Sequence, residues 1–301
     1  MLKINSCKCE SLAEVRQIAT QLDRAIEVSP LFFDVQGVRH QTNDWKGIYN
    51  VSKDTYCKTV SRDMYRLITH REFLETFAET LDRLNLPYSM SIKDSGSTIF
   101  TDVTFKNNKF ELKKVGENFV TGIRIINSYD RTYPIVIMPN LIRLACSNGM
   151  ILSHFETKFN VKHSSILARE IETLMETKVK NIINGYATFQ NYVETSIADS
   201  IEWKIACKIM EKIIKQPKHL EEVLKILGIA RIETIEKSVK TGKYVFVADK
   251  LTDKSKLTRW QLYNAITQYA THGQMLSPFV EMALQHEAEK LLYTPLLQIK
   301  V

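Results

Sequence analysis

Side chains that stack on bases and side chains that hold phosphates are mixed between residues 106 and 133. Proteins that bind single strands use this combination, because bases stack on aromatic rings while guanidinium and ammonium groups contact the phosphates. Arg124 lies between Ile123 and Ile125, so in a strand it points away from both. Phenylalanines in the same stretch alternate as core residues do. The candidate nucleic-acid-binding residues from this pattern are Lys106, Lys109, Lys113, Lys114, Arg124, Tyr129, Arg131 and Tyr133.

A second chemistry is suggested by Asp102 and the Glu111-Leu-Lys113 segment. Two carboxylates and a lysine in this order are typical of metal-dependent nucleases, where the acids hold a hard cation and the lysine assists the attacking water. In the hairpin expected here, however, Asp102 lies opposite Lys113, and a cross-strand charge pair on a solvated face explains the same residues. We therefore expect no catalytic residue and keep the nuclease as an alternative.

Other catalytic and cofactor motifs are missing from the sequence. It has no Walker-type glycine loop, no dinucleotide fingerprint and no His-Glu-x-x-His pair. Its five cysteines are scattered, and Cys7-Lys-Cys9 lacks the two-residue gap of a zinc knuckle. We expect no cofactor and no metal site.

The candidate residues belong to a segment with the two-residue period of strands. Thr98 to Phe105 alternates, Asn107-Asn108 suits a two-residue turn, and Lys109 to Lys113 alternates again. Two further strands are expected near residues 118–128 and 132–138, and short extended pieces are expected earlier in the chain near residues 48–51 and 64–68. The pattern predicts an antiparallel meander with one buried face and one wet face.

Helical spacing marks most of the remaining chain. Apolar residues recur every three to four positions in the first helix and in the long stripe that follows Ser164, and Thr69–Glu72 and Thr258–Gln261 are capping boxes. The expected helices cover residues 11–28, 69–84, 139–148, 164–193, 258–271 and 278–292.

These elements predict an α+β fold. An antiparallel β-meander core of four or more strands, for which an OB-like, partly closed barrel is one form, is covered by helices, and the C-terminal half is largely helical. Residues 1–150 hold the meander-containing region and residues 151–301 the mainly helical region. We expect the two regions to pack as one continuous domain.

Composition fits a polyanionic partner inside the cell. The 301 residues carry a net charge of +7, with a pI near 9.0. The longest apolar runs, such as Pro134–Met138, are too short to cross a bilayer, and the N-terminus does not look like a secretory signal. We expect a cytoplasmic protein, in the host cytoplasm if a phage encodes it, with no membrane contact.

Three blocks of sequence resemble a known family. They are Met64–Glu72, the pair Gly122–Asp130 and Asn140–Met150, and Trp260–His272. In this order they are similar to the phage/plasmid-like family known as a domain of unknown function. Its members carry an Asn-Ser-Tyr-Asp strand, an Arg-Leu-x-Cys-x-Asn-Gly segment and a late Trp…Asn-Ala-x-Thr…His helix.

The resemblance implies DNA replication or recombination, because members of the family sit in mobile replicons and some have been related to strand-annealing proteins. It adds Asn127, Arg143 and Trp260 to the candidate binding residues. The same motif positions are equally explained as a buried polar network that joins the late helix to the sheet. Many members have Asp-Gly where this chain has Asp130-Arg131, so the resemblance implies a different turn here.

We therefore predict a protein that binds single-stranded DNA in phage or plasmid replication or recombination, by aromatic stacking and phosphate contacts. The alternatives are a single-strand annealing protein, the metal-dependent nuclease, and a protein-interaction factor without affinity for nucleic acid. Expected partners are single-stranded DNA and replication proteins of the same replicon. The sequence leaves the oligomeric state open.

Overall fold

The protein has the predicted α+β fold, with antiparallel sheets and helices in one chain. It divides into two compact units that interleave along the sequence, whereas the sequence analysis divided the chain at residue 150. The first unit is 1–108, 121–140 and 156–184, and the second is 109–120, 141–155 and 185–301. The computed structural model describes residues 5–23, 26–51, 54–112, 116–143, 148–151, 159–161, 165–214, 217–227, 235–237, 244–246, 257–273 and 276–293.

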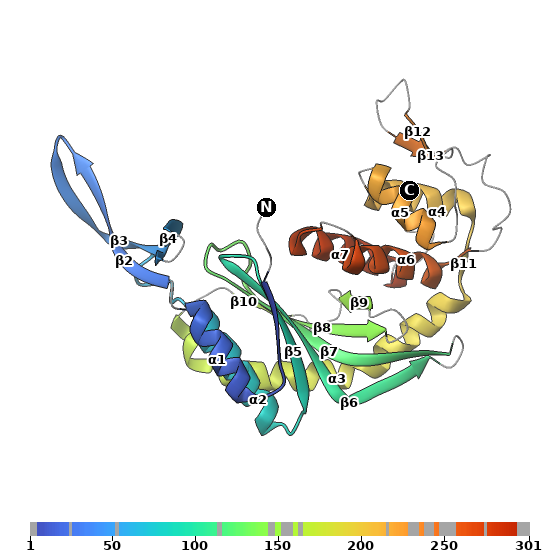
Figure 1. Cartoon of the computed structure of the whole chain (residues 1–301), viewed down its shortest axis with the longest axis horizontal. Helices are drawn as coiled ribbons and strands as arrows, with labels where there is room; N and C mark the ends of the chain where they lie inside the picture. The colour runs from blue at the N-terminus through green and yellow to red at the C-terminus, as the bar shows by residue number, and fades with distance from the viewer. Residues whose placement is uncertain are drawn as a thin grey trace. The chain divides into compact units, whose positions relative to one another are not determined.

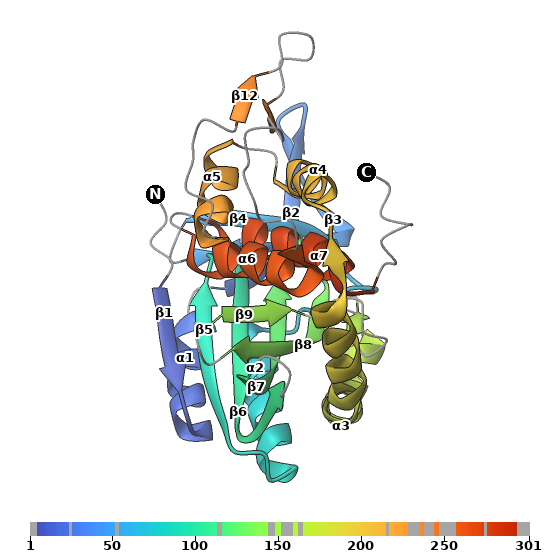
Figure 2. The same ribbon diagram turned by 90° about the vertical axis from the view of Figure 1, so that its right-hand side faces the viewer.

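The largest sheet contains the predicted meander. Its strands run in the order β1-β5-β6-β7-β8-β10, with β9 paired to β8, so β5 to β8 are neighbours in both sequence and space (Figure 2). The sheet is not a closed barrel. The strands are β1 (Asn5–Cys9), β5 (Tyr88–Asp94), β6 (Thr98–Leu112), β7 (Glu117–Ser128), β8 (Ile135–Arg143), β9 (Asn148–Ile151) and β10 (Phe159–Val161).

Strand β6 is continuous, and the turn predicted at Asn107-Asn108 was wrong. A two-residue hairpin turn of the favoured type needs a positive φ at both central residues, and neither asparagine has one. Both ends of this segment are instead held in the sheet. The Lys106 N–H donates to the Pro87 carbonyl at 2.9 Å, and the Asn108 carbonyl accepts a hydrogen bond from the Thr121 hydroxyl at 3.1 Å.

The short helix predicted from Pro139 to Asn148 was also wrong, since β8 runs through Pro139 to Arg143 and β9 begins at Asn148. Pro139 continues the apolar strand that Ile135 begins. Proline is tolerated in a strand where its missing N–H is not required by the ladder.

Three helices belong wholly or partly to the first unit. They are α1 (Leu12–Asp23), α2 (His70–Arg83) and α3 (Ser165–Ala198), of which α3 runs on into the second unit. The predicted cap of α2 is confirmed, because the Thr69 hydroxyl accepts a hydrogen bond from the Glu72 N–H at 3.0 Å. The buried face of α2 carries Phe73, Leu74, Phe77 and Leu81.

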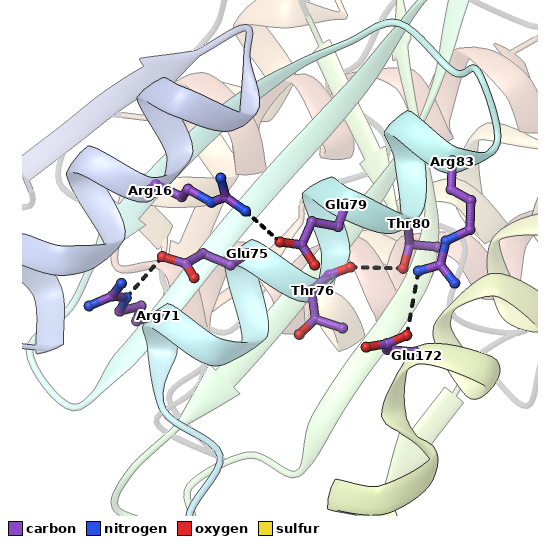
Figure 3. Close-up of polar contacts among 8 residues, drawn as sticks. All are labelled: Arg16, Arg71, Glu75, Thr76, Glu79, Thr80, Arg83 and Glu172. Atoms are coloured by element: carbon purple, nitrogen blue, oxygen red, sulfur yellow. Dashed lines mark hydrogen bonds and ion pairs between the residues drawn. The ribbon is translucent and has the colours of Figure 1, made fainter.

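Ion pairs link these helices on their outer sides (Figure 3). Arg16 of α1 contacts Glu79 of α2 at 2.8 Å, and Arg83 of α2 contacts Glu172 of α3 at 3.7 Å. Exposed pairs of this kind contribute at most about 1 kcal/mol each. Burial of the apolar helix faces therefore supplies most of the stability of this packing, and the ion pairs help to fix the orientation of the helices relative to one another.

The second unit is mainly helical, as predicted. Its described helices include α4 (Trp203–Ile213), α5 (Pro217–Ile226), α6 (Arg259–His272) and α7 (Pro278–Tyr293), and it has the short pairs β11 (Ser200–Ile201) with β14 (Leu257–Thr258) and β12 (Ile235–Lys237) with β13 (Tyr244–Phe246). The capping box of α6 is confirmed at Thr258 and Gln261. None of the helices in the described part of the chain is both long and apolar enough to cross a membrane.

A separate three-stranded sheet in the first unit was mostly missed by the sequence analysis, which expected only a short strand near Ile48–Val51. It has the order β2 (Ile26–Val35), β3 (Val38–Asn50) and β4 (Thr55–Ser61). Gln36 and Gly37 join β2 to β3 with φ angles of 50° and 81°. Two positive φ angles give the turn whose twist matches a β-hairpin.

Loss of the α2 cap should destabilise the first unit. Thr69→Ala leaves the Glu72 N–H without its side-chain acceptor, so we expect unfolding to cost about 1 kcal/mol less. Urea unfolding followed by circular dichroism measures this. Thr177→Ala is the matched control, because the exposed Thr177 hydroxyl bonds only to the Thr173 carbonyl within α3. Equal stability of the two variants would contradict the assigned cap.

Candidate nucleic-acid interface

Arg124, the central cation of the predicted surface, is buried. It is 3% exposed on β7 and makes a bidentate pair with Asp102 of β6, at 2.5 Å from Nε and 2.7 Å from Nη2. Asn140 Nδ2 donates to the same carboxylate at 3.0 Å. A guanidinium that is paired in this way is satisfied inside the protein and does not offer its charge to a phosphate.

Asn127 and Tyr129 are also buried, in a polar network around His70. The Tyr129 hydroxyl accepts a hydrogen bond from the His70 N–H at 2.7 Å, and the two rings stack at 3.7 Å. Asn127 Nδ2 donates to the Ile68 carbonyl at 3.0 Å and lies 3.1 Å from His70 Nδ1. This network joins the start of α2 to β7, so the Tyr129 ring is not presented for stacking on a base.

The turn after Tyr129 is organised by Asp130. Its carboxylate accepts hydrogen bonds from the hydroxyls of Ser97 and Ser128, both at 2.5 Å, and from the Thr132 N–H at 2.9 Å. Partial burial acts to raise the pKa of Asp130, but the hydrogen bonds from Ser128, Ser97 and Thr132 outweigh it and lower that pKa to about 2.

Arg131 adopts a left-handed conformation in this turn, with φ of 61°. That is the conformation glycine adopts most readily. Arginine here takes the backbone conformation that glycine adopts most readily, and the expected difference from the turn of an Asp-Gly sequence stays a prediction. Its side chain is exposed.

Trp260 is buried in the second unit. It is 2% exposed at the start of α6, meets the Phe119 ring edge-to-face at 6.0 Å and stacks with Tyr263 at 5.6 Å. The indole therefore belongs to the core of that unit.

The remaining predicted residues differ in exposure, and three of them are only partly described or lie outside the described part of the chain. Lys106 is exposed and pairs with Glu10 at 2.6 Å, Lys109 is exposed, and Tyr133 is half-buried against Phe100. Lys113 and Lys114 lie outside the described residues, as does the side chain of Arg143 on β8. Among the described members of the predicted set, Arg124, Asn127, Tyr129 and Trp260 are thus buried, and Lys106, Lys109 and Arg131 are exposed.

The nuclease residues are not brought together either. Asp102 and Glu111 lie nine residues apart on the continuous strand β6 and belong to different compact units. Their odd spacing also places them on opposite faces. Among the described residues, no group of three or more His, Cys, Asp or Glu side chains is arranged to hold a metal ion.

The β2–β3–β4 sheet presents exposed rings that the sequence analysis missed. Trp45 and Tyr56 are 49% and 51% exposed. Trp45 shares its face of β3 with Gly47 and Tyr49 by alternation, and Tyr49 lies opposite Tyr56. The register of β2 and β3 shifts between Pro30 and Phe32, so residues 38 and 40 of β3 take their face from the paired residues 35 and 33 of β2, which alternate with Leu31 beside Gly47. The aromatic face, as we call this side of the sheet, carries Leu31, Phe33, Val35, Val38, His40, Trp45, Tyr49 and Tyr56.

Gly47 lies at the centre of the aromatic face. A Cβ atom at this position would come 2.9 Å from the Leu31 Cδ2 atom and 3.6 Å from the Tyr56 Cε2 atom. The missing side chain therefore makes room for the neighbouring side chains to lie across the strand. The Tyr56 hydroxyl is fixed by the Thr59 hydroxyl and the Tyr49 hydroxyl by Asp54, so both rings are held in place.

The reverse face of the sheet carries its anchor and its cations. Ile48 and Val60 are buried with Tyr65 and Tyr129 in one apolar cluster. Lys46 lies opposite Val60 and Lys58 opposite Ile48 on the same side. The sheet is thus fixed to the first unit at one end of its reverse face, while the rings of the aromatic face stay exposed.

A sequence signal for this sheet was present. Trp45 and Tyr49 lie on one face of a two-residue period whose other face has Asp44, Lys46, Ile48 and Asn50, and Gln36-Gly37 can make a two-residue turn. Val35 and Val38 lie directly on either side of that turn. The turn is therefore not marked by a stretch of polar residues between two strands.

The stability of the first unit should depend on pH through Asp130. Its pKa is lower in the folded protein than in an unfolded chain, so its ionised form stabilises the fold above about pH 4 and this stabilisation is lost as the pH falls toward 2. We expect Asp130→Asn to be less stable than the native protein at pH 7 and to approach it as the pH falls. Urea unfolding across this range measures both. A difference that is constant with pH would contradict the assignment.

Comparison with known proteins places the chain in a family. No curated protein and no solved structure matches it. A family model described as "Domain of unknown function (DUF932)" matches residues 58–292. Strands β2 and β3 precede the matched range, whereas β5 to β8 and α6 lie inside it. Because the match covers most of the sequence, the chain belongs to the DUF932 family of domains of unknown function.

Proposed function

We propose that the protein binds single-stranded DNA, with bases stacked on the rings of Trp45 and Tyr56. The observation that carries this proposal is the exposure of about half of each ring on one face of the sheet. Stacking of a base on an aromatic side chain contributes about 1–3 kcal/mol. Two rings held by a rigid sheet supply this without a large loss of side-chain entropy.

A single strand fits the aromatic face better than a duplex. Rings that project from a sheet need the flat face of a base, which is covered in a duplex by the neighbouring base pairs. Unpaired bases expose these faces. A base stacked on Trp45 also keeps its Watson–Crick edge open to a complementary strand, and this supports the annealing of strands as a form of the same activity.

Phosphate contacts would come from the cations beside the rings. Lys46 follows Trp45 directly, and Lys58 lies two residues after Tyr56. Their side chains leave the reverse face and are long enough for their ammonium groups to reach the rim of the sheet. Asp44 and Asp54 offset part of their charge, so stacking supplies the larger share of the affinity.

The setting that agrees with this activity is the replication or recombination of a phage or plasmid, in the cytoplasm of the host. The sequence blocks that resemble the phage/plasmid-like family support it, together with the net charge of +7. Partners would then be single-stranded DNA and replication proteins of the same replicon.

Loss of a ring should weaken binding. We expect Trp45→Ala or Tyr56→Ala to reduce the affinity for a labelled single-stranded oligonucleotide by about 5- to 100-fold, as loss of one stacked base requires. Fluorescence anisotropy measures this. Phe32→Ala is the matched control, because Phe32 is 48% exposed on the opposite face of the same sheet. Equal losses in all three variants, or no binding by the native protein at low salt, would contradict the proposal.

Salt should weaken the binding only moderately. Each phosphate neutralised on a single strand contributes about −0.7 to the slope of log K against log salt concentration. With Lys46 and Lys58 as the main contacts, we expect a slope between about −1 and −2. A titration at several salt concentrations measures it, and a much steeper slope would place the interface on a more basic surface.

A further inference from the structure

The outer part of β2 and β3 is a two-stranded hairpin with both edges open. β4 pairs with β3 only from Trp45 to Asn50, so no strand of the described part of the chain lies beside residues 31–44 as a third strand; we call these residues the tip hairpin (Figure 1). A two-stranded hairpin that no sheet or helix covers is only marginally stable in water. The tip hairpin therefore lacks a structural neighbour among the described residues.

The tip hairpin also exposes apolar side chains. Phe33, Val35 and Val38 of the aromatic face are 48%, 49% and 58% exposed, and every residue from 32 to 41 is exposed. Contiguous exposed apolar side chains beside an open strand edge mark an interaction surface.

The free edge of β2 is complementary to itself. We propose that the tip hairpin pairs with the tip hairpin of a second copy of this chain, through antiparallel contact of the two β2 strands about Phe33. In this register Leu31 of one copy faces Val35 of the other, and the two Phe33 side chains face each other. Pro30, which lacks an N–H, ends the pairing on one side.

Charge on the reverse side of the tip hairpin permits this pairing. Asp34 lies opposite Arg39 within the hairpin, and the Arg39 guanidinium lies 4.7 Å from the centre of the Phe32 ring. In the proposed register Asp34 of one copy lies opposite Phe32 of the other, so no two like charges face each other directly across the junction. Cross-strand pairs of opposite charge stabilise a sheet, whereas unmatched like charges oppose it.

The product is a four-stranded sheet at the centre of the dimer, in which the aromatic faces of two copies are continuous. The contact itself does not depend on nucleic acid. It would nevertheless place two sets of stacking rings on one surface, and so lengthen the single strand that one assembly holds.

Sedimentation velocity of the full chain over a wide range of concentration tests the pairing. We expect a monomer–dimer equilibrium that Phe33→Glu shifts to monomer, because it places two carboxylates against each other, while Phe32→Ala leaves it unchanged. A native chain that stays monomeric throughout, or a dimer that survives Phe33→Glu, would overturn the proposal.

Cysteine cross-linking tests the register. Phe33→Cys should give a covalent dimer on mild oxidation, because the two positions face each other. Val38→Cys is the control, since it is exposed on the same face but its two copies are separated by both β2 strands. The native chain, which keeps its own cysteines, sets the background. Equal cross-linking of the two variants would overturn the register.

The two proposals fail separately. Trp45→Ala should leave the sedimentation of the protein unchanged while it weakens binding to the oligonucleotide. A dimer without affinity for single strands would sink the proposed function alone, and binding by a protein that is always monomeric would sink the pairing alone.

Discussion

The side chain of Tyr129 joins three parts of the first unit. Its hydroxyl fixes the first N–H of α2, its ring stacks on His70, and the same ring belongs to the cluster of Ile48, Val60 and Tyr65 that anchors the β2–β3–β4 sheet. Burial of so large a ring contributes a few kcal/mol, and the buried hydrogen bond makes its position specific. The position of the β2–β3–β4 sheet on the first unit therefore depends on Tyr129, the residue that directly follows β7.

This arrangement explains why the central strands are poor candidates for contact with DNA. Polar residues of β7 that would suit a nucleic-acid surface, such as Arg124 and Asn127, are paired with Asp102 and with the Ile68 carbonyl inside the protein. Buried polar groups need such partners, and once they have them they stabilise the fold and are not free for a ligand. The exposed rings of Phe32, Phe33, Trp45 and Tyr56 lie on the sheet that this network supports.

The sequence predicted those elements whose signals are local. The caps at Thr69 and Thr258 and the late helices α6 and α7 depend on residues within one turn of each other, and they were confirmed. The turn at Asn107-Asn108 failed because strand pairing overrode a weak local preference. Whether a segment turns or continues as a strand is here set by partners such as Pro87, which lies too far along the sequence to contribute to a local turn pattern.

The candidate site was harder to predict for the same reason. Whether Arg124 faces water or Asp102 is decided by a residue twenty-two positions away in the neighbouring strand. Trp45 is exposed because no helix or strand of the described part of the chain packs over it, and the composition of the sequence does not predict this. The family match begins at residue 58, so strands β2 and β3 lie outside the matched range.

Photo-cross-linking of a halogenated single-stranded oligonucleotide, followed by mass spectrometry of the adduct, tests the central claim most directly. A halogenated base that stacks on an aromatic side chain forms a covalent adduct with that side chain on irradiation. The account predicts adducts on the peptides that contain Trp45 or Tyr56. Adducts confined to the segment around Tyr129 and Arg131, or to the second unit, would contradict it and would show that DNA binds at another surface of the protein.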